Sequence, residues 1–422
     1  MKRNSLSQAV QSSLKLNCYH DYWVAYSGGV DSHVLLHVLS CLRSQYPFQL
    51  HAIHVNHQLH GNSMQWASHC EQVCRALEVP IMIKNIEVIT AFGESVEAIA
   101  RAMRYKIFSE TLPTDAALLT AHHQDDQAET VLLQLLRGAG VAGLSAMPES
   151  KPFAKGVLLR PLLICSRDEI VQYAETQSLE WIEDSSNTDI NINRNYLRHE
   201  ILPLLQKRFP GMKTTLSRSA KHCASACHLL NEIAEQDYQK MSVRCHDALT
   251  LPINALTEIS LTRRINVIRY WLMQNNVRMP NEKKLNAILK NVIPAREDAN
   301  PSVSWDQVEV RRYQHHLYIV HKDNFDPKII IPWDGKNDCQ LPTGEIISKH
   351  CLKKILGLLG EEKLSIRYRQ GGEQLKTTTH HHALKKWFQE NRIPPWQRDR
   401  IPLLFVDDEL VFVLQKNNKD FK

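Results

Sequence analysis

Short apolar runs alternate with stretches of helical period through the first 140 residues of the chain. Buried strands are predicted at residues 23–26, 50–55, 81–86 and 117–121, and helices at 32–43, 64–77, 96–112 and 126–136. Four consecutive strand-and-helix units are typical of a parallel sheet covered by helices. We therefore predict that the chain begins with an α/β domain built on a doubly wound parallel sheet.

The pattern changes after Pro161. A capping-box sequence at 166–169 predicts a helix to about residue 177, and the polar run at 183–189 predicts a surface loop. Residues 216–293 have helical periods throughout, 308–320 predict a hairpin, and prolines and glycines near 327–335 mark a linker. We therefore predict three domains: an α/β domain at 1–217, a mostly helical middle domain with a terminal hairpin at 218–326, and a small α+β C-terminal domain at 327–422.

Composition excludes several classes of protein. Hydrophobic residues make up 43% of the chain, and no apolar run approaches the ~18 residues that span a bilayer. The N-terminus has a basic start without the apolar core of a secretory signal, so we expect a cytoplasmic protein with no membrane partner. The ten cysteines are dispersed without a C-x-x-C pair and are interpreted as buried free thiols.

The net charge of +6 is unevenly distributed. Residues 1–217 contain 19 Lys and Arg against 21 Asp and Glu, whereas residues 218–422 contain 32 against 24. This asymmetry suits a catalytic front domain followed by domains that hold a polyanion such as nucleic acid. A solvated basic surface is the alternative explanation.

The clearest chemical signal is the run Ser27, Gly28, Gly29, Val30, Asp31 and Ser32 between the first predicted strand and helix. Glycines let the backbone approach a ligand, and the open amides of a helix N-terminus attract anions, so a phosphate chain is the expected occupant. A carboxylate beside phosphates is repulsive unless a divalent cation lies between them. Asp31 is therefore predicted to bind magnesium.

This run resembles the PP-loop of the ATP pyrophosphatases, whose sheet is of the adenine nucleotide alpha hydrolase type. Residues 54–57, 97–105 and 120–130 are similar to segments of the tRNA(Ile)-lysidine synthetase family in particular. So are residues 181–187 with Arg194, Asn195 and Arg198, and the segments 385–388 and 393–404 near the C-terminus. The resemblance therefore covers the full length of the chain. It implies that residues 1–217 form the PP-loop ATP-binding catalytic domain and that residues 327–422 form a tRNA-binding domain.

The resemblance implies a ligase that joins free L-lysine to C2 of cytidine 34 in an isoleucine tRNA with a CAU anticodon. ATP would adenylate the C2 oxygen, and AMP and pyrophosphate would be released, changing codon reading from AUG to AUA. ATP and magnesium are the implied cofactors. No protein partner is implied, and a homodimer is left open.

The run from His122 to Asp126 is predicted at the carboxyl end of the fourth strand, the edge at which ligands bind such sheets. Adjacent histidines on a strand end point to opposite faces, so zinc binding by both is disfavoured. One of Asp125 and Asp126 is expected to be a second magnesium ligand, for which we take Asp125, and the other to cap the following helix.

The remaining site assignments belong to ATP or to the substrates. His54 and Val55 are expected to contact the nucleotide. Glu129 is expected to bind the lysine amino group, with a solvated helix face as the alternative, and Arg101 and Arg104 to line the mouth of the site, with surface pairing to Glu97 as the alternative. The full expectation is catalytic Asp31, Asp125, Asp126 and Arg101, with His123, Arg104, Glu129, Arg194, Asn195 and Arg198 binding substrates.

Two rival functions remain at this point. One is another PP-loop enzyme, such as a sulfur transferase, but the chain has no C-x-x-C pair. The other is a catalytically silent tRNA-binding protein, against which the intact loop argues. For the last domain, we expect residues beyond about Lys328, including Trp387, Trp396 and Arg398, to hold the tRNA away from its anticodon.

Overall fold

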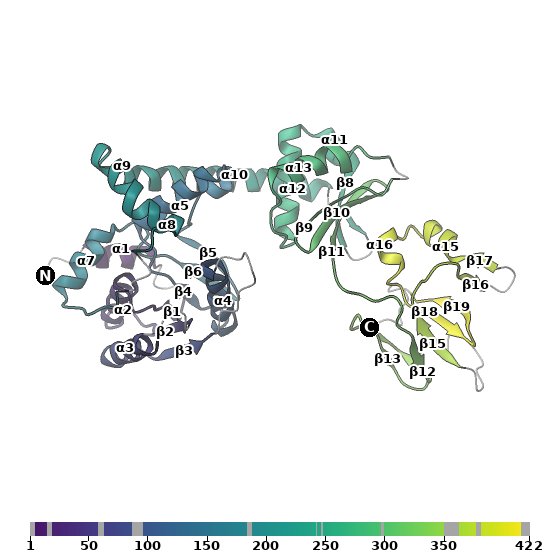
Figure 1. The fold of residues 1–422 in the computed structure, drawn as a ribbon, viewed down its shortest axis with the longest axis horizontal. Coiled ribbons are helices and arrows are strands. Elements are labelled where there is room, and N and C mark those ends of the chain that lie inside the picture. Colours follow the sequence, from purple (N-terminus) through teal and green to yellow (C-terminus); the bar gives the residue numbers. More distant parts are fainter. Residues whose placement is uncertain are drawn as a thin grey trace. The chain divides into compact units, whose positions relative to one another are not determined.

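The computed structural model describes residues 5–14, 19–57, 63–86, 96–183, 188–241, 243–245, 248–296, 299–349, 363–376 and 381–414. The chain forms two compact units, Met1–Glu232 and Ile233–Lys422 (Figure 1). No helix of the described residues is long and apolar enough to cross a membrane.

A six-stranded sheet forms the centre of the first unit, in the order β3-β2-β1-β4-β6-β5. The strands are β1 (Asp21–Ala25), β2 (Gln49–Asn56), β3 (Ile81–Asn85), β4 (Ala117–Leu119), β5 (Ser150–Phe153) and β6 (Gly156–Leu159). All pairings are parallel except that of β5 with β6. The predicted doubly wound sheet is confirmed, whereas the β5–β6 hairpin was not predicted.

Helices cover both faces of this sheet, as Figure 1 shows. They are α1 (Ser5–Ser13), α2 (Val30–Leu42), α3 (Ser63–Ala76), α4 (Val96–Thr111), α5 (Gln124–Leu136), α6 (Val141–Leu144) and α7 (Arg167–Thr176). On β1, Tyr22 and Val24 pack into the core shared with α1, α2, α3 and α7, and Trp23 and Ala25 into the core shared with α4. Because both faces are buried, every position of the strand is apolar or aromatic after Asp21.

The strand order reverses between β1 and β4, with β2 on one side and β6 on the other. Ligands bind at such a reversal, beyond the carboxyl ends of the strands. The segments that follow β1 and β4 are the loop before α2 and the residues that open α5. The first unit ends with α8 (Asn193–Tyr196), a π-helical turn η2 (Leu197–Ile201), α9 (Leu202–Arg208) and the first part of α10 (Met212–Met241).

The second unit begins with helices packed on an antiparallel sheet. Its strands, in the order β7-β8-β11-β10-β9, are β7 (Val243–Cys245), β8 (Ala248–Pro252), β9 (Ser302–Trp305), β10 (Val308–Tyr313) and β11 (His316–His321). Its helices are α11 (Ile253–Glu258), α12 (Leu261–Gln274), α13 (Glu282–Ala287) and the π-turn η3 (Ile288–Val292). The hairpin at 308–320 is confirmed, but the prediction of helix throughout 216–293 is wrong at β7 and β8. A five-residue segment such as β8 is too short for its hydrophobic period to separate strand from helix.

The last part of the chain is rich in short strands. It contains β12 (Ile331–Trp333), β13 (Cys339–Gln340), β14 (Ile346–Ile347), β15 (Leu364–Arg367), β16 (Gln374–Lys376), β17 (His381–Ala383), α15 (Leu384–Glu390), α16 (Pro395–Arg398), β18 (Leu403–Val406) and β19 (Glu409–Val413). Strands β12, β15, β18 and β19 form one antiparallel sheet. The helix predicted near 383–391 is confirmed as α15.

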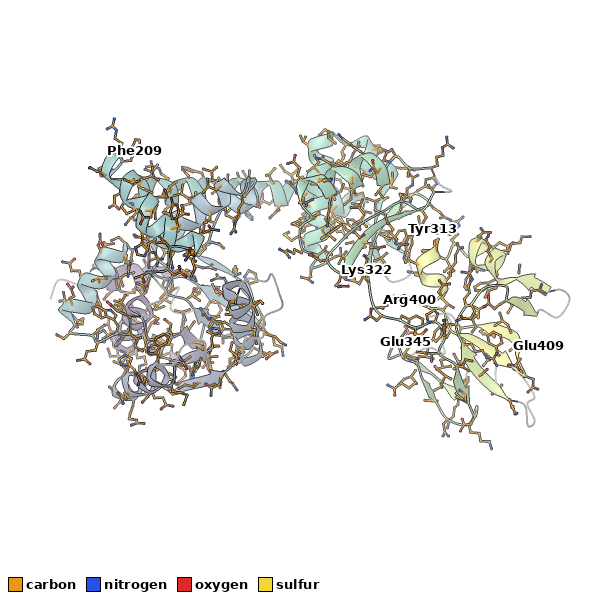
Figure 2. All side chains as sticks on the ribbon, in the orientation of Figure 1. Phe209, Tyr313, Lys322, Glu345, Arg400 and Glu409 are labelled. Atoms are coloured by element: carbon orange, nitrogen blue, oxygen red, sulfur yellow. The ribbon has the colours of Figure 1, made fainter. Side chains whose placement is uncertain are left out.

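Two of the three residues expected to hold tRNA here have internal contacts instead. Arg398 is buried, and its Nε donates to the carbonyl of Ile393 at 2.9 Å. Trp396 packs edge-on against Tyr318 and Tyr313, the latter labelled in Figure 2, with ring centroids 5.3 and 6.1 Å apart. Arg398 and Trp396 therefore contribute to the fold, and their contact with tRNA stays a prediction.

Candidate active site

The loop between β1 and α2 has a backbone that requires glycine. Gly28 has a φ of +88°, and a Cβ there would lie 2.8 Å from the Cδ1 of Ile182. The carbonyl of Gly28 accepts from the amide of Ile182 at 3.0 Å, which fixes the loop against a distant segment. At the start of α2, Gly29 supplies no side-chain cap. The first amides of this 13-residue helix are therefore left for a ligand, and a helix N-terminus favours an anion.

Asp31 lies in the first turn of α2 and faces the residues that open α5. Its Oδ1 is buried and has no hydrogen-bond partner among the described residues. The Nε2 of His123 lies 3.7 Å from the Oδ2 of Asp31 and 3.4 Å from the Oδ2 of Asp126. Burial raises the pKa of Asp31 and Asp126 adds to the rise, while His123 opposes it. The buried Oδ1 without a partner among the described residues and the raised pKa make the Asp31 carboxylate a good acceptor for a cation.

Two carboxylates of α5 pair with two arginines that arrive from α8 and η2. Glu129 is fully buried, and its oxygens accept from the Nε of Arg194 and the Nε of Arg198, both at 2.6 Å. The Oδ1 of Asp126 accepts from the same two guanidinium groups at 2.7 and 3.3 Å. Burial alone would raise the pKa of Asp126, but His123 and Arg194 outweigh it and lower the pKa to about 2.

The π-turn η2 carries one of these arginines. Arg194 lies on α8 and Arg198 four residues later within η2, and both reach Glu129. A π-turn contains one more residue than an α-turn and is often found at functional sites. Asn195 points elsewhere: it is buried, and its amide donates to the carbonyl of Asp189 at 3.0 Å. Of the polar loop predicted at 183–189, residues 184–187 lie outside the described part of the chain.

Asp125 is engaged on both oxygens. Its Oδ1 accepts from the backbone amide of Arg167 at 3.2 Å, and its Oδ2 forms an ion pair with the Nζ of Lys213, in the first turn of α10. Asp126, not Asp125, closes the helix start, because its Oδ2 accepts from the amide of His123 at 3.0 Å. The prediction that one of the two aspartates caps this helix is thus confirmed for Asp126.

Residues of β2 and α4 line the neighbouring part of the edge. The Nδ1 of His54 lies 2.9 Å from the carbonyl of Tyr26, just before the glycine loop, and Val55 follows it on β2. On α4, Arg104 donates to the Nε2 of His57 at 3.0 Å, while the guanidinium of Arg101 lies 5.0 Å from the ring centroid of Tyr105. The side chain of Glu97, the alternative partner of Arg101, lies outside the description.

The two adjacent histidines have different surroundings. The Nδ1 of His122 lies 2.9 Å from the hydroxyl of Thr120, and burial lowers its pKa to about 3. His123 faces Asp31 and Asp126 instead. No group of three His, Cys, Asp or Glu side chains among the described residues is arranged to hold a metal.

The structure brings together most of the predicted site at one edge of the sheet. The residues that meet are Asp31, His123, Asp125, Asp126, Glu129, Arg194 and Arg198. Asn195 lies apart, and Arg101 and Arg104 have separate partners. Sequence reasoning missed Lys213, which has no distinguishing signal at the start of a polar helix. It also missed Arg160. Here a signal was present, because an arginine that directly follows a buried strand lies at the edge of the sheet where ligands bind.

Comparison with known families accounts for most of the chain. A model described as a PP-loop domain matches residues 3–205, one described as the TilS substrate binding domain matches 251–318, and one described as the TilS substrate C-terminal domain matches 364–416. With the glycine loop at the switch point of a parallel sheet, these matches define a PP-loop enzyme, a class whose substrate is ATP.

Relatives narrow the assignment further. The tRNA(Ile)-lysidine synthase of Coxiella burnetii is 42% identical over 404 residues, covering 93% of this chain and 88% of its own. The enzyme of the same name from Legionella pneumophila strain Lens is 42% identical, with 93% and 90% covered, and that from Serratia proteamaculans is 40% identical, with 98% and 94% covered. The chain belongs to the tRNA(Ile)-lysidine synthase family.

Proposed function

We propose that this chain uses ATP to join the ε-amine of free L-lysine to C2 of cytidine 34 in an isoleucine tRNA with a CAU anticodon. The C2 oxygen attacks the α-phosphate, pyrophosphate departs, and lysine then displaces AMP from the adenylated cytidine. The observation that carries the proposal is the open helix N-terminus beside Asp31, set against a buried cluster of carboxylates and arginines.

Magnesium fits this arrangement at Asp31. The Oδ1, which has no hydrogen-bond partner in the described part of the chain, and the raised pKa of that carboxyl both indicate a group that a cation would stabilise. Bound with ATP, magnesium would draw charge from the phosphates as pyrophosphate leaves. Asp125 is a weaker candidate than the sequence suggested, because both of its oxygens are engaged, and it would have to release Lys213 first.

The substrate lysine suits Asp125 better than Glu129. Both oxygens of Glu129 already accept from Arg194 and Arg198 at 2.6 Å, and its charge faces two guanidinium groups, so it is a weaker partner for an ammonium group. Asp125 already holds the ammonium of Lys213. We therefore assign Glu129 to positioning the two arginines, and Asp125 to receiving the amine of lysine in exchange for Lys213.

The thiol chemistry of the rival sulfur transferases finds little support at this site. Cys70 lies next to the loop, since its Sγ would be 3.1 Å from a Cβ at Gly28. Burial raises the pKa of Cys70 and of Cys74 to about 12. A thiol with such a pKa is not a thiolate at neutral pH and makes a poor sulfur carrier.

Selection of one tRNA requires a second contact away from the anticodon, because duplex RNA is recognised mainly by shape and backbone. We assign this contact to the last domain, where Lys385 on α15 and Arg392 just after it are exposed. Lys385→Gln should make the salt dependence of binding to full-length tRNA shallower by up to about one unit, since each phosphate contact releases counterions. Binding of an isolated anticodon stem–loop should not change.

The reaction is tested by incubating the full chain with ATP, labelled lysine and a tRNA bearing the CAU anticodon, then analysing the nucleosides. Label should appear in a modified cytidine, together with equal AMP and pyrophosphate. Asp31→Asn should prevent both. A lysyl-adenylate formed without tRNA would refute the proposal, since the enzyme would then activate a carboxylate.

A further inference from the structure

Three cationic side chains gather around Tyr105, at the edge of the sheet beyond β4. Arg101 lies one turn before Tyr105 on α4, with its guanidinium carbon 5.0 Å from the ring centroid, and the Nζ of Lys151 on β5 lies 6.0 Å from the same centroid. Arg160 directly follows β6 and hydrogen-bonds to Tyr105. Since β6 pairs in parallel with β4, Arg160 lies at the same carboxyl edge as the residues that open α5.

These cations lack the anionic partners that the neighbouring arginines have. Arg160 is only 4% exposed; its Nη1 donates to the carbonyl of Pro148 at 2.6 Å, and its buried Nε has no partner among the described residues. In the described part of the chain, neither Arg160 nor Arg101 nor Lys151 forms an ion pair, whereas Arg194 and Arg198 each contact two carboxylates.

The positive charges in this group oppose one another. Partial burial lowers the pKa of Lys151, and Arg160 and Arg101 lower it further. A buried cation without a counter-charge is costly, and an anionic ligand would remove that cost. His122, next to the group, has its pKa lowered to about 3 and so adds no charge at neutral pH. The three cations therefore form a site for an anion.

We propose that Arg101, Lys151 and Arg160 bind a phosphodiester group of the tRNA anticodon loop, beside the cytidine that is activated. The proposal rests on the proposed function, because it takes the tRNA as ligand. The phosphates of ATP have their own place at the N-terminus of α2, which follows β1. Strand β6 lies two strands from β1 in the sheet, or about 10 Å at ordinary strand spacing. An anion at Arg160 thus lies at the same edge of the sheet as the N-terminus of α2, about two strands away from it.

The test measures binding of an anticodon stem–loop RNA to the full chain as a function of salt concentration. Lys151→Gln and Arg101→Gln change exposed side chains, so loss of folding is not a concern. Each should weaken binding and make the slope of log affinity against log salt shallower by up to about 0.7, the value for one contact to single-stranded nucleic acid. Affinity for ATP should stay unchanged. Arg160→Gln, a buried change, should have the same effect if the variant folds.

Two matched controls lie on the same elements. Lys155→Gln removes an exposed charge from the turn between β5 and β6, and Lys106→Gln removes one from α4, where Lys106 forms an ion pair with Glu110. Neither should change the slope.

The proposal is overturned if Lys151→Gln and Arg101→Gln leave the slope unchanged, or if the controls alter it equally. It is also overturned if ATP or pyrophosphate affinity falls while the RNA slope holds, because the cluster would then serve the nucleotide. A chain that binds the stem–loop without forming lysidine would refute the proposed function alone.

Discussion

Replacing Glu129 by glutamine separates its structural role from a role in binding lysine. The substitution keeps the shape of the side chain but removes the charge that faces Arg194 and Arg198. Removing one partner of a buried ion pair costs about 3–5 kcal/mol when the other charge is left alone. The two arginines are 27% and 23% exposed and retain Asp126, so we expect a loss at or just below the lower end, about 2–3 kcal/mol.

For a unit of this size, such a loss lowers the melting temperature by about 2–4 °C per kcal/mol, or about 4–12 °C in all. Calorimetry of the full chain should show this in the transition that ATP shifts upward, because ligand binding identifies the ATP-binding unit. The matched control is Glu110→Gln, an exposed residue whose only described partner is Lys106 at 3.9 Å; it should cost below about 0.5 kcal/mol. If Glu129→Gln has the same melting temperature as the wild type while the KM for lysine rises tenfold or more, Glu129 binds the substrate and does not serve to position the two arginines.

Asp31→Ala should abolish release of pyrophosphate while tRNA affinity stays near that of the wild type; normal AMP release by this variant would exclude Asp31 as the magnesium ligand. ATP and tRNA without lysine should yield pyrophosphate and an adenylated cytidine, detectable by mass spectrometry, and their absence would mean that lysine acts first. Gly28→Ala should fold poorly or lose ATP binding in a calorimetric titration, since its Cβ would lie 2.8 Å from Ile182 in a left-handed backbone; unchanged affinity would show that the loop can rearrange. Burial lowers the pKa of His33 to about 4, so the unfolded chain takes up its proton first and stability falls as pH drops from about 6.5 toward 4. His33→Gln should reduce that slope, measured by thermal unfolding, by about 1.4 kcal/mol per pH unit, and an unchanged slope would count against the assignment.

Hydrophobic periodicity was sufficient to predict the sheet of the first unit. Strands β1 to β4 have apolar side chains on both faces, so each stands out between helices of regular period. The glycine loop was equally readable, because Gly28 needs a backbone that other residues rarely adopt. The hairpin of β5 and β6 was not predicted: β5 is mostly exposed, and its Pro152 argues against a strand unless it lies at a sheet edge, as it does.

The state of Glu129 could not be read from its own helix. A glutamate one turn after Asp125 looks the same in sequence whether it faces solvent, a substrate or an arginine. Its partners lie 65 and 69 residues further along the chain, and only the fold brings them together. The ion pair of Asp125 with Lys213 is likewise a product of tertiary structure, across 88 residues. The sequence can therefore predict which charged residues lie at a site, but the fold is needed to know which of them form ion pairs with one another.

At the π-turn Leu197–Ile201, the change that would improve stability is expected to differ from the change that would preserve activity. Deleting one residue from the turn would return the segment to ordinary α-helical register, with better hydrogen bonds, and would rotate Arg198 by about 100° away from Glu129. Such a deletion would be attractive to any procedure that rewards thermal stability alone. Consensus design or directed evolution of this enzyme for heat resistance should therefore use lysidine formation as a second criterion. A more regular helix at this turn would move Arg198 away from Glu129 and is expected to lower activity.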